Sequence, residues 1–239
     1  MPSRHGDPIP LSSYTLPKLH PLSSYTLPNL QEPKTMMLRQ NDFFRLFGSG
    51  LPTTTTLQDL DDMEYGSIDD RRALLALARS VHPATVIEIG VQSGGTARLL
   101  LDELPCIRKY IGIDLPPGQT PALSGQDSEL PAAPGGLVAD HPAFRLLLAR
   151  SETFAPKKLP KADLVYIDGG HDADTVLADT LLARQIVKPG GLLIWHDYHN
   201  HTVQVTAVID SLNQSEGDHI CLVEGTWIVF QLAATLPGM

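Results

Sequence analysis

The sequence predicts a three-layer α/β fold with a mainly parallel sheet and a C-terminal antiparallel hairpin. Short apolar strands alternate with helical segments from residue 67 to residue 213, which is typical of a parallel sheet covered by helices. The strands are apolar throughout, which indicates burial on both faces. The last two strands, within residues 219–232, follow one another without a helix between them, so they must pair antiparallel.

Composition narrows the classes of function. The chain has 239 residues, of which 42% are hydrophobic, so it is long enough for one large core. Its net charge of -9 argues against nucleic acid or an anionic membrane as a partner, because both require a basic surface. The two cysteines, Cys106 and Cys221, lie far apart in sequence, which favours a reducing cytoplasm over a disulfide framework. No apolar run reaches membrane-spanning length, and no signal-peptide pattern is present.

The chain is expected to divide into three parts. Residues 1–35 contain an eleven-residue tandem repeat, "PLSSYTLPKLH" and "PLSSYTLPNLQ", which is rich in Pro and Ser and predicts a disordered extension. Residues 36–66 are expected to form a lid or cap segment, and residues 67–239 the main domain. The loop at 116–140, which contains five prolines, is a second candidate for a lid.

Local signals predict each element of the main domain. Ser67, with Asp70 three residues later, predicts a capped helix that Pro83 ends. In the helix expected at 173–187, the acids Asp172, Asp174 and Asp179 are assigned to the N-terminus and the solvent face. The elements after the first helix are expected to be a strand at 85–91, a helix at 95–104, strands at 109–115, 144–150 and 164–169, a helix at 173–187, a Pro189-Gly190-Gly191 turn, a strand at 192–197, a helix at 202–213 and the two final strands.

The segment "EIGVQSGG", residues 88–95, joins the first strand to its helix. Gly90 permits a tight turn, and Gly94 and Gly95 allow the backbone to approach a ligand at a helix N-terminus. Glu88 is a carboxylate on an otherwise apolar strand, and burial of such a group is costly unless it is paired. Asp114 ends the next strand, where an acid can accept hydrogen bonds from ribose hydroxyls. Taken singly, these residues fit ordinary turns, caps and structural acids; together they favour a nucleoside-bearing cofactor.

Two further strands end in polar side chains. Asp168 and His171 follow one strand in "IDGGHD", and His196 and Asp197 follow the next in "IWHDYHNH". Neighbouring parallel strands lie about 4.8 Å apart, so these four side chains are expected to converge. The alternative for His171 is a cap on the helix that begins near Ala173. Trp195 is expected in the core, and Tyr198 in the wall of an acceptor pocket.

The segments "VIEIGVQSGGTARLLL", "YIGIDL", "LVYIDGGHDADTVLADT" and "GGLLIWHDY" resemble the successive motifs of class I S-adenosylmethionine-dependent methyltransferases. Within that superfamily, the chain is similar to macrocin-type sugar O-methyltransferases and cephalosporin hydroxylase-like proteins, over about residues 67–232. The resemblance implies a Rossmann-like methyltransferase domain. It implies that the loop from Gly90 to Gly95 wraps the methionine part of S-adenosylmethionine, with Glu88 near its amino group. It also implies that Asp114 holds the ribose and that Ser151 contacts the adenine region, although a helix cap fits Ser151 equally well.

The same resemblance implies that a divalent cation such as Mg²⁺ binds at Asp168, His196 and Asp197, and that His171 is the base. One departure puts the metal in doubt, because His196 stands where some metal-binding relatives have an acid. Imidazole is a poor ligand for Mg²⁺ and a better one for Mn²⁺, Fe²⁺ or Zn²⁺. A softer metal and a metal-free site therefore stay open.

The expected function is an S-adenosylmethionine-dependent O-methyltransferase that acts on a hydroxyl of a small molecule, such as a sugar or another secondary metabolite. Two alternatives stay open: a metal-dependent hydrolase or oxygenase on the same scaffold, and a non-catalytic module that binds the cofactor. The sequence does not decide between a monomer and a homo-oligomer, and it does not identify the acceptor.

Overall fold

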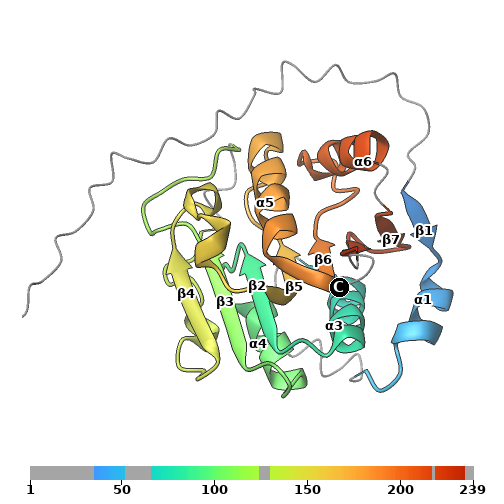
Figure 1. The fold of residues 1–239 in the computed structure, drawn as a ribbon, viewed down its shortest axis with the longest axis horizontal. Helices are drawn as coiled ribbons and strands as arrows, with labels where there is room; N and C mark the ends of the chain where they lie inside the picture. The colour runs from blue at the N-terminus through green and yellow to red at the C-terminus, as the bar shows by residue number, and fades with distance from the viewer. Residues whose placement is uncertain (1–34, 52–65, 124–129, 217–218, 235–239) are drawn as a thin grey trace, which may run out of the picture. The chain divides into compact units, whose positions relative to one another are not determined.

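The structure, a computed structural model, describes residues 35–51, 66–123, 130–216 and 219–234. Nearly all of the predicted disordered extension, and the 52–65 part of the predicted cap segment, lie outside these ranges. Figure 1 shows the helices and strands. Their bounds are β1 Met36–Leu38, α1 Gln40–Phe47, α3 Ile68–Val81, β2 Thr85–Ile89, α4 Gly95–Glu103, β3 Lys109–Asp114, η4 Gly136–Val138, β4 Phe144–Leu148, η5 Ser151–Thr153, η6 Pro156–Lys158, β5 Ala162–Ile167, α5 Ala173–Ile186, β6 Val187–Trp195, α6 Val205–Glu216, β7 Cys221–Val223 and β8 Val229–Leu232.

The described strands form one sheet in the order β1-β7-β8-β6-β5-β2-β3-β4. Neighbouring strands pair in parallel from β6 through β5, β2 and β3 to β4, and β1 pairs in parallel with β7. Strand β8 runs antiparallel to both β6 and β7. The predicted mainly parallel sheet with an antiparallel C-terminal pair is therefore confirmed.

Helices cover both faces of this sheet, as the sequence predicts (Figure 1). One core lies under α1, α3 and α4 and includes Phe43, Leu74 and Leu100. The other lies under α5 and α6 and includes Ile186, Ile209 and Trp195, which is fully buried as expected. Successive strand residues point to opposite cores, so apolar side chains are needed at every position of the central strands.

The capping box at the start of α3 is confirmed. The Ser67 hydroxyl accepts from the backbone N–H of Asp70 at 3.0 Å, and the Asp70 carboxylate accepts from the backbone N–H of Ser67 at 2.8 Å. The predicted turn at Pro189-Gly190-Gly191 is wrong. These residues belong to β6, which starts at Val187 and contains an irregularity opposite β5. Gly190 has a φ of 73°, so the kink is absorbed by a residue without a Cβ.

The segment at 36–47 contributes to the fold. Residues 36–38 extend the sheet beside β7, and α1 buries Phe43 completely in the core under α3. Residues 36–47 of the predicted cap segment are therefore anchored in the sheet and the core. Cys106 and Cys221 are both free.

Candidate functional site

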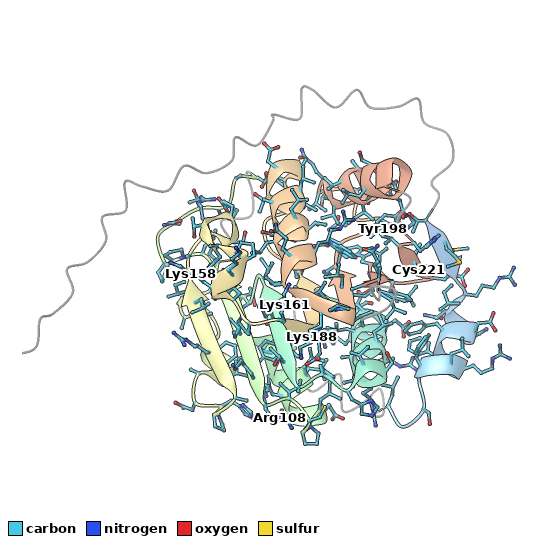
Figure 2. The ribbon with its side chains drawn as sticks, viewed as in Figure 1. Arg108, Lys158, Lys161, Lys188, Tyr198 and Cys221 are labelled. Atoms are coloured by element: carbon cyan, nitrogen blue, oxygen red, sulfur yellow. The ribbon has the colours of Figure 1, made fainter. Side chains whose placement is uncertain are left out.

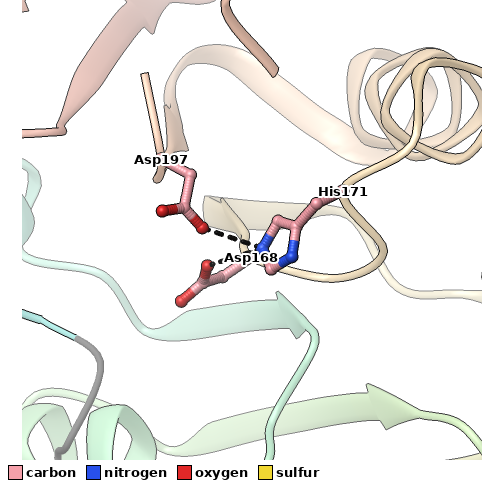
Figure 3. Close-up of side chains that lie close together, drawn as sticks. All are labelled: Asp168, His171 and Asp197. Carbon is pink, nitrogen blue, oxygen red and sulfur yellow. Dashed lines mark ion pairs between the residues drawn. The ribbon is translucent and has the colours of Figure 1, made fainter. Parts of the chain in front are cut away.

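Three polar side chains meet where β5 and β6 end (Figure 3). Asp168 follows β5 directly, His171 lies in the turn before α5, and Asp197 follows β6. The His171 Nε2 atom lies 2.8 Å from Asp197 Oδ2 and 3.8 Å from Asp168 Oδ1. One ligand atom from each residue lies within 4.8 Å of the other two, so the cluster could hold a metal ion. The predicted convergence of these strand ends is present in the structure.

The two strand ends lie side by side because β5 and β6 are paired in parallel, with Ile167 opposite Trp195. Asp197 has a φ of 60°, a left-handed conformation that Asp tolerates better than most residues. Its carboxylate is held from the other side by Asn200, whose Nδ2 donates to Asp197 Oδ1 at 2.8 Å. Asp168 is held by Tyr166, whose hydroxyl donates to Asp168 Oδ2 at 3.1 Å. Both carboxylates are thus fixed before any ligand binds.

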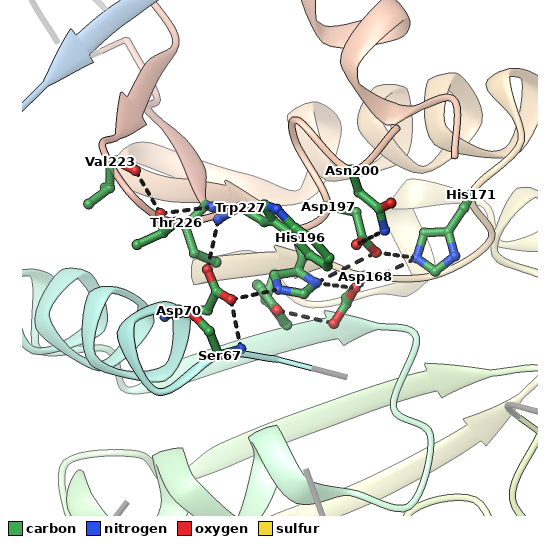
Figure 4. Close-up of polar contacts among 12 residues, drawn as sticks. Ser67, Asp70, Asp168, His171, His196, Asp197, Asn200, Val223, Thr226 and Trp227 are labelled. Atoms are coloured by element: carbon green, nitrogen blue, oxygen red, sulfur yellow. Dashed lines mark hydrogen bonds and ion pairs between the residues drawn. The ribbon is translucent and has the colours of Figure 1, made fainter. Parts of the chain in front are cut away.

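His196 lies between this cluster and Asp70 and is 6% exposed (Figure 4). Its Nδ1 atom is 3.3 Å from Asp168 Oδ1 and 3.6 Å from Asp197 Oδ2. Its Nε2 atom is 3.8 Å from Oδ2 of Asp70, the capping residue of α3. The other Asp70 oxygen accepts from the backbone N–H of Trp227 at 2.7 Å. Asp70 therefore connects α3, the β7–β8 turn and His196, a role that its local sequence does not reveal.

The possible metal ligands are Asp168, His171 and Asp197, so His171 replaces His196 in the predicted set of ligands. The His196 ring faces carboxylates on both sides, Asp70 on one and Asp168 with Asp197 on the other. It is better placed to orient the two acids than to project into the pocket.

The electrostatics of the cluster are strongly coupled. Burial opposes the charged form of His171, but hydrogen bonds and charge from Asp168 and Asp197 outweigh it and raise the pKa of His171 to about 10. Burial also raises the pKa of Asp168, but His196 and His171 outweigh it and lower that pKa to about 2. Burial likewise disfavours a charged His196, yet the surrounding acids hold its pKa well above the ordinary value. Without a bound cation, the cluster therefore contains two carboxylates beside imidazolium groups.

A pocket opens beside this cluster, at the carboxyl ends of the parallel strands. Its volume is about 780 Å³, which includes the open space at its mouth. Of the predicted site residues, Gly90, Asp114, Ser151, Asp168 and His171 line it. Segments of the 116–140 loop contribute Pro121, Ala122, Leu130 and Pro131 to its wall. The ends of four strands that are neighbours in the sheet, β5, β2, β3 and β4, thus surround one cavity.

Other predicted cofactor residues lie outside the pocket wall. Glu88 is 1% exposed and faces the core under α4, where its Oε2 accepts from the Tyr110 hydroxyl at 2.9 Å. Burial raises the pKa of Glu88 well above its usual range. Gly94 has a φ of 99°, and a Cβ there would lie 3.2 Å from Gly135 Cα, so this glycine allows the 135–138 segment to pack on the loop. Gly95 begins α4 and is buried.

Two further expectations are wrong. Asp179 does not lie on the solvent face of α5, since it is 1% exposed and lines the pocket. Tyr198 does not line the pocket; it lies beside α6 (Figure 2). It is buried, and its hydroxyl donates to Asp210 of that helix at 2.7 Å. The exposed side chains of His199 and His201 do not belong to the cluster.

Replacing Gly90 by Ala is expected to destabilise the protein by more than about 2 kcal/mol, because overpacking and an unfavourable backbone conformation act together. Gly90 has a φ of 87°, and a Cβ there would lie 2.0 Å from the backbone oxygen of Asp168. Urea unfolding measures the effect. Gly136→Ala is the matched control, since its Cβ would make only an ordinary 3.5 Å contact with Ala133. Equal stability of the two variants would contradict the packing argument.

Comparisons with known proteins agree with this geometry. Residues 87–198 match a family described as a methyltransferase domain. No curated protein sequence matches the chain significantly. The fold is similar to that of the methyltransferase PaMTH1 from Podospora anserina, solved with bound SAH, with a TM-score of 0.58 and 13% identity over 78% of this chain and 89% of that one.

Two other solved structures share the fold. A putative caffeoyl-CoA O-methyltransferase from Staphylococcus aureus has a TM-score of 0.57 and 12% identity, over 82% of this chain and 99% of that one. The MycE methyltransferase of the mycinamycin biosynthetic pathway, solved with Mg and SAH, has a TM-score of 0.51 and 13% identity, over 78% of this chain and 56% of that one. Within the described residues, no helix combines the length and apolarity needed to cross a bilayer. Residues 87–198, which contain the glycine turn and both polar strand ends, match a methyltransferase domain, and this match indicates an enzyme of the methyltransferase class.

Proposed function

We propose that the chain is an S-adenosylmethionine-dependent O-methyltransferase that acts on a hydroxyl of a small molecule with the assistance of a divalent cation. The observation that carries this proposal is the convergence of Asp168, His171 and Asp197 at the edge of the pocket that Gly90 and Asp114 also line. Solved structures with the same fold include O-methyltransferases, and one of them was solved with Mg and SAH.

The pocket residues fit an adenosyl cofactor. The Asp114 carboxylate accepts from the backbone N–H groups of Val91, Gln92 and Leu115 at 2.6 to 2.9 Å, which fixes it at the end of β3. One of its oxygens accepts two of these bonds and the other only one, so the second retains capacity for a ribose hydroxyl. The turn after β2 brings backbone rather than side chains to the ligand.

The strand-end cluster fits a divalent cation. Two carboxylates suit a hard ion such as Mg²⁺, whereas a His171 ligand suits Mn²⁺, Fe²⁺ or Zn²⁺ better. When bound, such an ion supplies a Lewis acid that makes a nearby hydroxyl easier to deprotonate. Positive charge between Asp168 and Asp197 would weaken the interactions that raise the pKa of His171, so that pKa would fall.

His171 can then accept the proton of the acceptor hydroxyl at Nε2, the nitrogen that faces the two acids. The 2.8 Å contact with Asp197 needs a proton on the same nitrogen, so Nε2 would act as the base only if a cation took the place of that contact and His171 were not itself a ligand. The acceptor oxygen attacks the methyl carbon of the sulfonium as the methyl–sulfur bond breaks, and S-adenosylhomocysteine leaves. The main contribution of the enzyme is to place the oxygen beside that carbon.

Calorimetric titration of the full chain with S-adenosylmethionine and S-adenosylhomocysteine tests the cofactor. Turnover of a panel of hydroxylated metabolites with labelled cofactor then tests the reaction, with Mg²⁺, Mn²⁺ or Zn²⁺ and with chelator. We expect micromolar binding of both compounds and transfer that depends on a divalent ion. A folded chain that binds neither compound would exclude the proposal, and full activity in chelator would exclude the role of the cation.

A further inference from the structure

Asp70 is a buried acid whose contacts go beyond the cap of α3. Its Oδ2 accepts from the backbone N–H of Ser67 at 2.8 Å, and its Oδ1 accepts from the backbone N–H of Trp227 at 2.7 Å. The residue is 4% exposed, and burial of a carboxylate is costly unless partners compensate for it. Burial raises the pKa of Asp70, but His196, Ser67 and Trp227 outweigh it and hold that pKa below its ordinary value. A capping box needs only groups of its own helix, so capping does not account for the contacts to Trp227 and His196.

His196 lies between Asp70 and the two acids of the strand-end cluster (Figure 4). Its Nε2 atom is 3.8 Å from Asp70 Oδ2, a distance that fits an ion pair rather than a direct hydrogen bond. Its other ring nitrogen, Nδ1, is 3.3 Å from Asp168 Oδ1 and 3.6 Å from Asp197 Oδ2. The imidazole ring is rigid, so a contact that fixes one nitrogen also determines where the other points. Asp70 is thus placed to set the direction of the nitrogen that faces both acids.

Two aromatic residues limit how far the His196 ring can turn. The ring centroid of Tyr166 lies 6.5 Å from that of His196, and the ring centroid of Trp227 lies 6.1 Å from it. Both neighbours are fixed in turn, since the Tyr166 hydroxyl donates to Asp168 and the Trp227 carbonyl accepts from the backbone N–H of Tyr198 at 3.1 Å. The ring is enclosed, and among the described residues Asp70 is the acid that lies within ion-pair distance of Nε2.

We propose that Asp70 is a positioning residue for the cation site: through His196, it fixes the carboxylates of Asp168 and Asp197 in the orientation that holds a divalent ion. This inference rests on the proposed cation-assisted function. Asp70 itself contacts neither the ion nor the reacting atoms. Groups that orient metal ligands from behind typically change metal affinity or activity by about 10- to 100-fold when they are removed. The first turn of α3 is therefore part of the support of a site whose ligands follow β5 and β6.

Two variants separate positioning from capping. Asp70→Asn retains the shape of the side chain and one oxygen that can accept from Trp227, but it removes the charge that faces His196. Ser67→Ala is the matched control, because it removes the hydroxyl that accepts from the backbone N–H of Asp70 at 3.0 Å and leaves the carboxylate in place. Both variants should lower the melting temperature, since both weaken the cap of α3. Only Asp70→Asn should disturb the strand-end cluster.

Calorimetric titration of the full chain with Mn²⁺ is the test. We expect Asp70→Asn to bind Mn²⁺ about 10- to 100-fold more weakly than the wild type, and Ser67→Ala to bind it within about twofold of the wild-type affinity. At a fixed Mn²⁺ concentration, kcat for methyl transfer should fall in Asp70→Asn. The KM for S-adenosylmethionine should stay within about twofold, because Asp70 is not among the residues that line the pocket. Asp70→Ser, whose hydroxyl can still accept from Trp227, is a second neutral variant with the same expected losses.

A double-mutant cycle with His196→Gln tests whether Asp70 acts through His196. In the His196→Gln background, Asp70→Asn should change Mn²⁺ affinity by less than about twofold, whereas a direct effect of its charge on the ion would persist there. Three results would overturn this assignment and leave the proposed function intact: wild-type Mn²⁺ affinity in a folded Asp70 variant, an equal loss in Ser67→Ala, or a full loss on adding Asp70→Asn to His196→Gln. A folded wild type that does not bind Mn²⁺ would instead exclude the role of the cation, and this assignment with it.

Discussion

Replacing Asp168 by Asn is expected to lower kcat for methyl transfer by about 10²- to 10⁴-fold and to weaken divalent-cation binding at least about tenfold. Asp168 is the acid on which the cluster centres, since its Oδ1 lies 3.3 Å from His196 and 3.8 Å from His171. Asn keeps the shape and can still accept from Tyr166, but it removes the negative charge that attracts a cation. Initial rates at saturating cofactor and calorimetric titration with Mg²⁺ or Mn²⁺ measure the two effects.

Asp174→Asn is the matched control, because it removes the same charge from an exposed position in the first turn of α5. It should change neither the rate nor the cation affinity. If Asp168→Asn remains folded and retains wild-type turnover and cation affinity, the strand-end cluster is not the reaction centre.

The fold was predictable because its signals are local. Strands β2, β5 and β6 are apolar runs that an α-helix follows, and the Ser67-Asp70 cap identifies the start of α3. Strand β1 was missed because a three-residue strand with exposed Met36 and Met37 has neither the length nor the burial pattern of the others. The turn expected at Pro189 was wrong because a β-bulge uses the same residues as a turn, and only the pairing with β5 distinguishes the two.

The site was predictable to the extent that strand ends define it. Parallel strands end at the same edge, so Asp168 and Asp197 had to be near each other once their strands were recognised. Asp70 was interpreted as a cap alone, because its contact with the Trp227 backbone spans 157 residues and leaves no local pattern. Asp179 did leave a signal: it lies three residues after Val176 and four before Ala183, so it shares their buried helix face.

His171 provides the second large effect, which is a pH dependence of cation binding. Its pKa is about 10 in the cation-free protein, against 6.5 ordinarily, so at neutral pH the site holds a proton that a cation must displace. Apparent cation affinity should therefore rise with pH, by up to about tenfold per unit below pH 10. The acids contribute little to this slope, since the pKa of Asp168 is about 2 and that of Asp197 is also lowered. Calorimetry with Mn²⁺ from pH 6 to pH 9, in buffers of different ionisation enthalpy, measures both the affinity and the protons released.

The same shift predicts how stability varies with pH. A group whose pKa is higher in the folded protein stabilises it fully below the unfolded pKa, here about 6.5, and this stabilisation disappears as pH rises through about 10. The free energy of unfolding of cation-free protein should therefore fall between pH 7 and pH 10.

The variant His171→Gln tests both pH effects. It should lose that part of the decline in stability, reduce the pH slope of cation binding and lower kcat by about 10²- to 10⁴-fold. His199→Gln, which alters an exposed histidine just beyond β6, should behave like the wild type in all three measurements. If His171→Gln keeps both the wild-type slope and the wild-type rate, His171 is neither the group that loses its proton when a cation binds nor the base. His196 then becomes the candidate for both roles, because the same acids also raise its pKa.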